Sequence, residues 1–204
     1  MQRVFINGGW IRRIYQTDRA EFAAHLIRLD AESRHDRFAM AVSDAYLESY
    51  VNGFFAAPGD IAYGWFVDGE LRGAGELRQA DEGSNDERTA EGAFSVERDF
   101  RRGGVGEALM VRIVRAARNR RDTSLCLLCL AENRAMQNLA KKFSAELTFG
   151  RDQITGRLVA RHLSAASLWN EWADDARGLM GSLVTAHHPH IHVSGGQITT
   201  KPAE

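Results

Sequence analysis

The chain has 204 residues, of which 44% are hydrophobic and 26% charged, and its 26 Lys and Arg against 27 Asp and Glu give a net charge of −1. This composition is typical of one globular domain with a sizeable core, and it excludes disordered, collagen-like and coiled-coil proteins. The longest apolar run, Leu125 to Ala131, is far shorter than the ~20 residues that cross a bilayer, and no signal-peptide pattern opens the chain. We therefore expect a soluble, cytoplasmic protein that does not bind membranes.

The first 37 residues predict a short strand and one helix. Residues 12–15 have strand character, and Asp18 followed by Glu21 resembles a capping box. Phe22, Leu26 and Leu29 then recur at helical spacing. The polar residues 30–37 are expected to be a connection.

A second helix and a hairpin follow. Ser43 is a candidate N-cap, and Gly53 is expected to end the helix. Residues 61–67 and 71–78 are two strand candidates around Asp68-Gly69, a dipeptide favoured in tight hairpins.

The centre of the chain has the order strand, glycine loop, helix. An exposed loop at 81–88 precedes a strand over 90–96, and after the loop Arg101–Gly106 a helix places Leu109, Ile113 and Ala116 inward. Its arginines at 112, 115 and 118 are expected to face solvent.

The rest of the chain predicts a buried strand, two helices and two outer strands. The strand covers 124–131, and Asn133 opens a helix whose inner face carries Met136, Leu139, Ala140 and Phe143. Strands are expected at 146–150 and 154–162, a helix over about 168–184, and a loosely ordered tail after it.

Glycines at the start of a helix let the backbone approach a ligand, and the unpaired N–H groups of the first turn attract phosphate oxygens. A P-loop is excluded because Glu107-Ala108 follows Gly106, and a dinucleotide fold is disfavoured because Leu109 replaces the third glycine. A tight turn without a ligand is the remaining structural alternative.

The spacing Arg101-x-x-Gly104-x-Gly106 after a strand that ends in Phe94-Ser95-Val96 resembles the Arg/Gln-x-x-Gly-x-Gly/Ala signature of the GCN5-related N-acetyltransferase (GNAT) superfamily. The resemblance covers roughly residues 11–162 and includes the order of elements and the place of Asn133. Residues 31–38 also look like the Pro-Glu-Ser-Arg-Tyr-x-Arg-Phe stretch of bacterial protein-lysine acetyltransferases of the Pat type.

The resemblance implies a mixed α/β (α+β) fold, with a mostly antiparallel sheet of about seven strands, helices on both faces, and a splay between strands 90–96 and 124–131. Acetyl-CoA would lie in that splay as acyl-donor co-substrate, with no metal required. The cofactor-binding residues that the resemblance implies are Phe94, Ser95, Val96, Arg101, Arg102, Gly103, Gly104, Val105, Gly106, Glu107 and Asn133.

Acetyl transfer needs a neutral amine, and a carboxylate is the usual proton acceptor. Glu91 is the first candidate because it matches the position of the catalytic glutamate in Pat-type enzymes; an edge carboxylate without a catalytic role is the alternative. Glu76 and Glu132 are weaker candidates. None of the tyrosines lies where many family members place the general acid, which leaves the acid unassigned, with Ser144 or solvent as options.

Three other features are interpreted as structural. Cys126 and Cys129 would point to opposite faces of a strand and so cannot hold one metal ion. The arginine-rich helix has no interleaved aromatic residues, so its arginines are interpreted as a solvated face and not as a nucleic-acid site. The histidines at 187, 188, 190 and 192 lie outside the matched region, and we assign no metal site to them.

These observations predict a single acetyltransferase domain over residues 1–166, followed by a C-terminal helix and a histidine-containing tail at 167–204. The expected activity is transfer of acetyl from acetyl-CoA to a primary amine, either a small molecule or a protein lysine, by direct attack in a ternary complex. A homodimer is compatible with the sequence. The alternatives are a catalytically silent acyl-CoA sensor and, with less support, an RNA-associated acyltransferase.

Overall fold

The computed structural model describes residues 5–79, 89–120, 122, 124–150, 153–159, 173–178 and 180. Its centre is an eight-stranded sheet with the strand order β1-β2-β3-β4-β5-β6-β8-β7. The strands are β1 (Phe5–Ile6), β2 (Gly9–Ile14), β3 (Ile61–Val67), β4 (Glu70–Gln79), β5 (Thr89–Val96), β6 (Ser124–Leu130), β7 (Glu146–Phe149) and β8 (Gln153–Val159). Neighbouring strands are antiparallel except for β5 and β6, which confirms the mixed, mostly antiparallel sheet.

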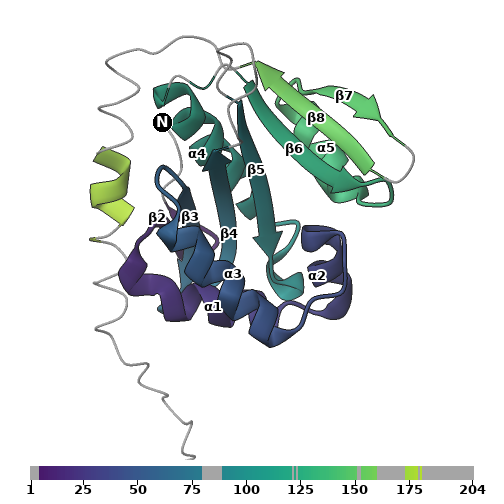
Figure 1. Cartoon of the computed structure of the whole chain (residues 1–204). Helices are drawn as coiled ribbons and strands as arrows, with labels where there is room; N and C mark the ends of the chain where they lie inside the picture. Colours follow the sequence, from purple (N-terminus) through teal and green to yellow (C-terminus); the bar gives the residue numbers. More distant parts are fainter. Residues whose placement is uncertain are drawn as a thin grey trace, which may run out of the picture.

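Helices cover both faces of this sheet (Figure 1). They are α1 (Arg19–Arg28), α2 (Ala31–Phe38), α3 (Asp44–Ala56), α4 (Val105–Asn119) and α5 (Arg134–Lys142), with short 3-10 turns at Gln16–Asp18 and Arg98–Phe100. One hydrophobic cluster joins α1 and α3 to the sheet, and a second joins α4 and α5 to the opposite face. No helix in the described part of the chain is long and apolar enough to span a membrane.

The expected hairpin is confirmed at Asp68-Gly69. Both residues have positive φ, 51° and 82°, and Val67 pairs with Glu70 across the turn. Two consecutive positive φ angles match the right-handed twist of the flanking strands, and glycine accepts them without strain. The turn therefore fixes the register between β3 and β4.

Residues 30–37 are not the connection that their polarity predicted, because most of them form α2. The Asp30 side chain accepts a hydrogen bond from the Ser33 amide at 2.9 Å and so caps this helix. Gly53 is likewise not a helix end, since α3 continues to Ala56. Both predictions failed because they relied on local polarity and one glycine, whereas packing against the sheet decided the outcome.

Asp18 also has a different role from the expected one. Its carboxylate accepts from the backbone of Tyr15 at 2.9 Å and from Arg12 at 2.7 and 2.8 Å, and it makes no cap hydrogen bond to α1. It therefore fixes the turn between β2 and α1 and does not close a capping box with Glu21.

The strand predicted to be buried on both faces is only partly so. In β6, Leu125, Leu127 and Cys129 are buried, but Leu128 is 50% exposed and Cys126 is half-buried. The two cysteines are therefore not equivalent core residues. The face of β6 that carries Cys126 and Leu128 has less helical cover than the face packed on α5.

The pairing of β5 with β6 stops halfway along both strands. Thr89 pairs with Ser124, and the last pair is Gly92 with Leu127, after which the strands diverge. The remainder of β5 stays paired with β4 on its other side. This confirms the expected splay, and among the described residues no strand pairs with that edge of residues 93–96.

The arginines of α4 are the largest correction to the sequence analysis. Arg112 is 1% exposed and Arg115 is buried, although both were expected to face solvent. Their guanidinium groups lie 3.2 and 2.7 Å from the carboxylate of Asp174, in a helical turn at 173–178. Arg118, the third arginine of this set, is exposed as expected. Burial of the other two removes most of the charge on which an RNA-binding face of α4 would depend.

Candidate active site

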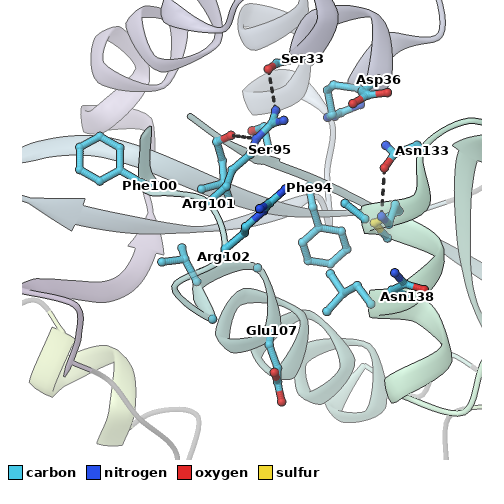
Figure 2. A pocket seen from close by; sticks show the side chains of 18 of the residues that line it. Ser33, Asp36, Phe94, Ser95, Phe100, Arg101, Arg102, Glu107, Asn133 and Asn138 are labelled. Carbon is cyan, nitrogen blue, oxygen red and sulfur yellow. Dashed lines mark hydrogen bonds between the residues drawn. The ribbon is translucent and has the colours of Figure 1, made fainter. Parts of the chain in front are cut away.

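The described residues enclose a cavity of about 540 Å³ at the point where β5 and β6 separate. Four elements contribute to its wall: the end of β5, the glycine loop with the first turn of α4, α2, and α5 (Figure 2). Its lining includes Phe94, Ser95, Val96, Arg101, Arg102, Gly104, Val105, Gly106, Glu107 and Asn133. All the predicted cofactor-binding residues except Gly103 thus line one cavity.

The glycine loop presents its backbone to this cavity. Gly104 is the N-cap of α4 with φ +82°, a conformation that disfavours any residue with a Cβ. Because the first amides of a helix have no intrahelical acceptor, those of residues 105–107 are donors for an anion, and the helix dipole adds to the attraction.

Gly103 supports the loop from outside the cavity lining. Its carbonyl accepts a hydrogen bond from Asn7 at 2.6 Å, and a Cβ at this position would lie 2.1 Å from the Asn7 amide nitrogen. Gly103 therefore permits close contact with the turn before β2, which holds the loop in place.

Arg101 is bound to the protein itself. Its Nε donates to the carbonyl of Val96 at 3.0 Å, and its Nη2 donates to the hydroxyl of Ser33 at 2.6 Å. Figure 2 shows this side chain reaching from the loop to α2. Arg102, with φ 63°, is exposed and lines the cavity. The two adjacent arginines thus have different surroundings.

Ser95 connects the cavity to a buried polar cluster that the sequence analysis missed. The Ser95 hydroxyl lies 2.9 Å from Nε2 of His25, and Nδ1 of His25 lies 3.1 Å from Oε1 of Glu97. The His25 side chain on α1 is fully buried. Burial lowers the pKa of His25, and the hydrogen bond with Glu97 offsets this only in part. A histidine on the apolar face of α1 was the only sequence signal.

Glu97 is held by three partners. Besides His25, Nε of Arg28 lies 3.0 Å from Oε1, and Nη1 of Arg72 lies 2.8 Å from Oε2. Burial acts to raise the pKa of Glu97, but the hydrogen bonds from His25 and Arg72 lower it below its ordinary value. This carboxylate is therefore ionised and fixed in orientation.

Glu76, a weaker candidate for the general base, has an ion-pair partner. It is 0% exposed, accepts from Arg37 at 2.8 Å, and accepts from the hydroxyl of Tyr50 at 2.5 Å. Burial raises the pKa of Tyr50, and the charge of Glu76 raises it further. Arg37 lines the cavity, whereas Glu76 does not, so this cluster supports the cavity wall.

Asp36 on α2 and Asn133 at the start of α5 both line the cavity. Asn133 caps α5 by accepting from the Met136 amide at 3.0 Å, as expected for the residue that opens this helix. Burial raises the pKa of Asp36, and the charge of Arg101 opposes this shift. Asp36 is therefore a further carboxylate at the cavity, which the sequence analysis did not single out.

Glu91 does not line the cavity. It is exposed on β5, opposite Arg78 of β4 and Cys126 of β6, one residue before the last β5–β6 pair. Because side chains alternate along a strand, Glu91 shares its face with Ala93 and Ser95. Glu132 and Ser144, the other candidates, are both exposed and also lie outside the cavity lining.

Residues 20–144 match the sequence profile of the acetyltransferase (GNAT) family. The GNAT domain of the Streptomyces lividans protein PAT is similar in structure, with a TM-score of 0.66 and 19% identity, covering 78% of this chain and 96% of that one. yncA from Salmonella typhimurium, solved with its cofactor acetyl-CoA, has a TM-score of 0.58 and 14% identity, covering 77% and 96%. A ribosomal-protein-alanine N-acetyltransferase from Brucella melitensis has a TM-score of 0.59 and 18% identity, covering 73% and 98%.

No protein of curated function matches the chain in sequence. The family profile nevertheless covers well over half of it, and the solved structures share its fold. The chain belongs to the acetyltransferase (GNAT) family, a class of acetyl-CoA-dependent N-acetyltransferases.

Proposed function

We propose that this protein transfers acetyl from acetyl-CoA to a primary amine by direct attack within a ternary complex. One observation carries the proposal: a single cavity joins the open edge of β5 to the N-terminus of α4. The first feature suits an extended amide-containing arm, and the second suits a pyrophosphate. Acetyl-CoA contains both groups.

The cofactor would be held mainly by the backbone. The pantetheine arm would pair with residues 94–96 as an additional strand, while the amides of Arg102–Glu107 hold the pyrophosphate. Arg102 is placed to add a charge-assisted contact, since it is exposed at the cavity. The Val96 carbonyl already accepts from Arg101, so a ligand amide would use its second lone pair.

The acceptor would be a cationic amine, with a protein lysine ahead of a small amine. Carboxylates attract an ammonium group, and both Asp36 at the cavity and Glu91 beside the splay are available for this. The acidic residues 81–87, part of the same expectation, lie outside the described residues. The preference for lysine rests on the Pat-like stretch at 31–38, which forms α2 and contributes Ser33, Asp36 and Arg37 to the cavity.

Glu91 is the proposed general base that removes the first proton from the incoming ammonium. Glu91→Gln should keep acetyl-CoA affinity and lower kcat by ~10²- to 10⁴-fold, with a flattened acid limb of the rate profile. The measurement is kcat against pH at saturating acetyl-CoA, and Glu48→Gln, which changes an exposed glutamate on α3, is the matched control. A Glu91→Gln variant as active as the parent would remove this residue from the mechanism.

The activity itself is tested by incubating the purified protein with acetyl-CoA and a panel of amines while thiol release is followed. Release that depends on a cationic amine supports the proposal. Tight acetyl-CoA binding without release with any amine would instead favour the sensor alternative. A preference for anionic or hydroxyl acceptors would contradict the charge argument for the acceptor.

A further inference from the structure

Amide formation from an ammonium and a thioester releases two protons from nitrogen. The first leaves before attack, because only the neutral amine has a lone pair. The second leaves the tetrahedral adduct, while the departing CoA thiolate must gain one proton to become the free thiol. Glu91 accounts for the first of these protons only, and Ser144, a candidate acid, is exposed outside the cavity lining.

We infer that Ser95, His25 and Glu97 form a proton relay that carries this second proton from the nitrogen of the adduct to the sulfur of CoA. This inference rests on the proposed function, since it assigns a step of that reaction. Ser95 is the one member that lines the cavity, and it lies on the strand proposed to hold the pantetheine arm.

The hydrogen-bond pattern gives the relay its direction. Glu97 is ionised and can only accept, so Nδ1 of His25 donates to it at 3.1 Å. Neutral His25 then has an unprotonated Nε2, which accepts from the Ser95 hydroxyl at 2.9 Å. The serine oxygen keeps its lone pairs for a proton that arrives from the cavity.

The step balances in atoms and electrons. As the N–C bond forms and the C–S bond breaks, Ser95 Oγ takes the proton from nitrogen, directly or through one water, and passes its own proton to Nε2 of His25. Glu97 stabilises the imidazolium that results. The proton then returns through Ser95 to the thiolate, which restores neutral His25 and yields the amide and the free thiol of CoA.

The surroundings favour a transient charge on His25 over a permanent one. Arg28 on α1 opposes protonation, Glu97 and Glu76 favour it, and Arg72 neutralises part of the Glu97 charge. Burial dominates and keeps the imidazole neutral at rest. The base form is therefore available at neutral pH, and His25 contributes its own acid limb to the rate below pH 6.5.

Ser95→Ala is the decisive variant because it removes one hydroxyl and leaves His25 and Glu97 in place. With saturating acetyl-CoA and Nα-acetyl-lysine amide as the acceptor probe, we expect kcat to fall by ~10²-fold while calorimetric acetyl-CoA affinity stays unchanged. Ser124→Ala is the matched control, since Ser124 is a buried strand serine with a side-chain contact to Thr89 outside the cavity. A Ser95→Ala variant with parental kcat overturns the relay.

The double variant Ser95→Ala/His25→Gln separates a relay from simple structural support. Members of one proton-transfer unit are strongly non-additive, so the double variant should be no slower than His25→Gln alone, and both should lose the acid limb that His25 contributes. The proposal is contradicted if the fall in kcat of the double variant equals the product of the falls in the two single variants. It is also contradicted if the acid limb of the rate profile is unchanged. Circular dichroism checks that the His25→Gln variants are folded.

A measurement without turnover distinguishes failure of the relay from failure of the proposed function. Long-range ¹H–¹⁵N spectra of the full chain at neutral pH should show His25 protonated on Nδ1 alone, with an Nε2 signal that shifts in Ser95→Ala. A proton on Nε2 overturns the relay whether or not any amine is acetylated. If the unmodified protein binds acetyl-CoA and shows the expected tautomer but acetylates no amine, the proposed acetyl transfer is rejected. The relay is then rejected with it, because it is assigned to a step of that reaction.

Discussion

The two ends of α4 carry arginines that look alike in the sequence and behave differently in the structure. At the N-terminal end, Arg102 is exposed at the cavity beside helix amides that lack intrahelical partners. In the C-terminal half, Arg112 and Arg115 are buried against Asp174. The arginine at the N-terminal end is placed to contact a ligand, whereas the arginines in the C-terminal half form ion pairs with a distant part of the chain.

The difference shows that helical spacing alone does not decide whether a charge faces water. Arg112 and Arg115 follow an i, i+3 pattern typical of a solvated face, but a carboxylate far along the chain covers them. The attraction of the N-terminal end for anions was predictable because it depends on local backbone geometry. Substitutions at Gly104, Asp174 and Arg101 test this contrast, and the pH dependence of stability tests the buried His25, in order of decreasing expected effect.

Gly104→Glu should weaken acetyl-CoA binding by ~10³-fold or about 4 kcal/mol, because a side chain and a negative charge would enter the anion site. Gly104→Ala is the control for backbone strain at φ +82°, and its loss should be much smaller, since the added Cβ would lie 3.5 Å from Ile6, an ordinary contact. Isothermal calorimetry with both variants gives the comparison. Unchanged binding in Gly104→Glu would mean that the loop is not the phosphate site.

Asp174→Asn should lower the free energy of unfolding by about 3 kcal/mol, since it removes the carboxylate charge that both buried guanidinium groups face. Urea denaturation measures the loss, and acetyl-CoA affinity should stay at the parental value because this end of α4 is remote from the cavity lining. Glu48→Gln on the exposed face of α3 serves as a reference for a harmless loss of charge. A stable Asp174→Asn protein would show that the contact contributes little.

Arg101→Ala should weaken acetyl-CoA binding by about 1 to 3 kcal/mol. Arg101 also joins Ser33 to the loop through hydrogen bonds, so two effects are combined in this variant. Titrations at increasing salt separate them, because a direct phosphate contact weakens as ionic strength rises and a structural contribution does not. Ser33→Ala removes the link from Arg101 to α2, together with a side-chain contact to Asp30, and leaves the Arg101 charge in place. A loss equal to that of Arg101→Ala would assign the whole effect to structure.

The stability of the fold should decrease by about 1 kcal/mol per pH unit as pH falls below 6.5. Burial holds the pKa of His25 below its ordinary value, so the unfolded chain takes up this proton first, and acid favours unfolding over that window. The stability that neutral His25 contributes is fully present above pH 6.5 and is lost as pH falls towards its folded pKa. Chemical denaturation at several pH values measures the slope, and a folded His25→Gln variant should have a shallower one.

The sequence predicted the features that depend on short-range geometry. The Asp68-Gly69 turn, the Gly104 helix start and the Asn133 cap each need a particular residue at one position, and each is present as predicted. The splay could be predicted only through the family resemblance, because no local pattern indicates where two strands separate.

The polar clusters around the cavity could not be predicted because they join residues far apart in the chain. His25 and Ser95 come from a helix and a strand separated by 70 positions, and Tyr50 and Glu76 are separated by 26. A single sequence shows each as an isolated polar residue on an apolar face. Only the fold shows that the hydroxyl of Ser95 contacts a histidine. It also shows that Glu91, chosen by resemblance, lies just outside the cavity.

The divergence of β5 from β6 gives the sheet an exposed edge in its interior. Unpaired edges at the border of a sheet invite other chains to add strands, which leads to aggregation. Here β6 lies on one side and α2 contacts both strands, so the opening suits a slender extended ligand better than a polypeptide with side chains on both faces. The fold thus exposes a short strand edge to a slender ligand without offering it to a second protein chain.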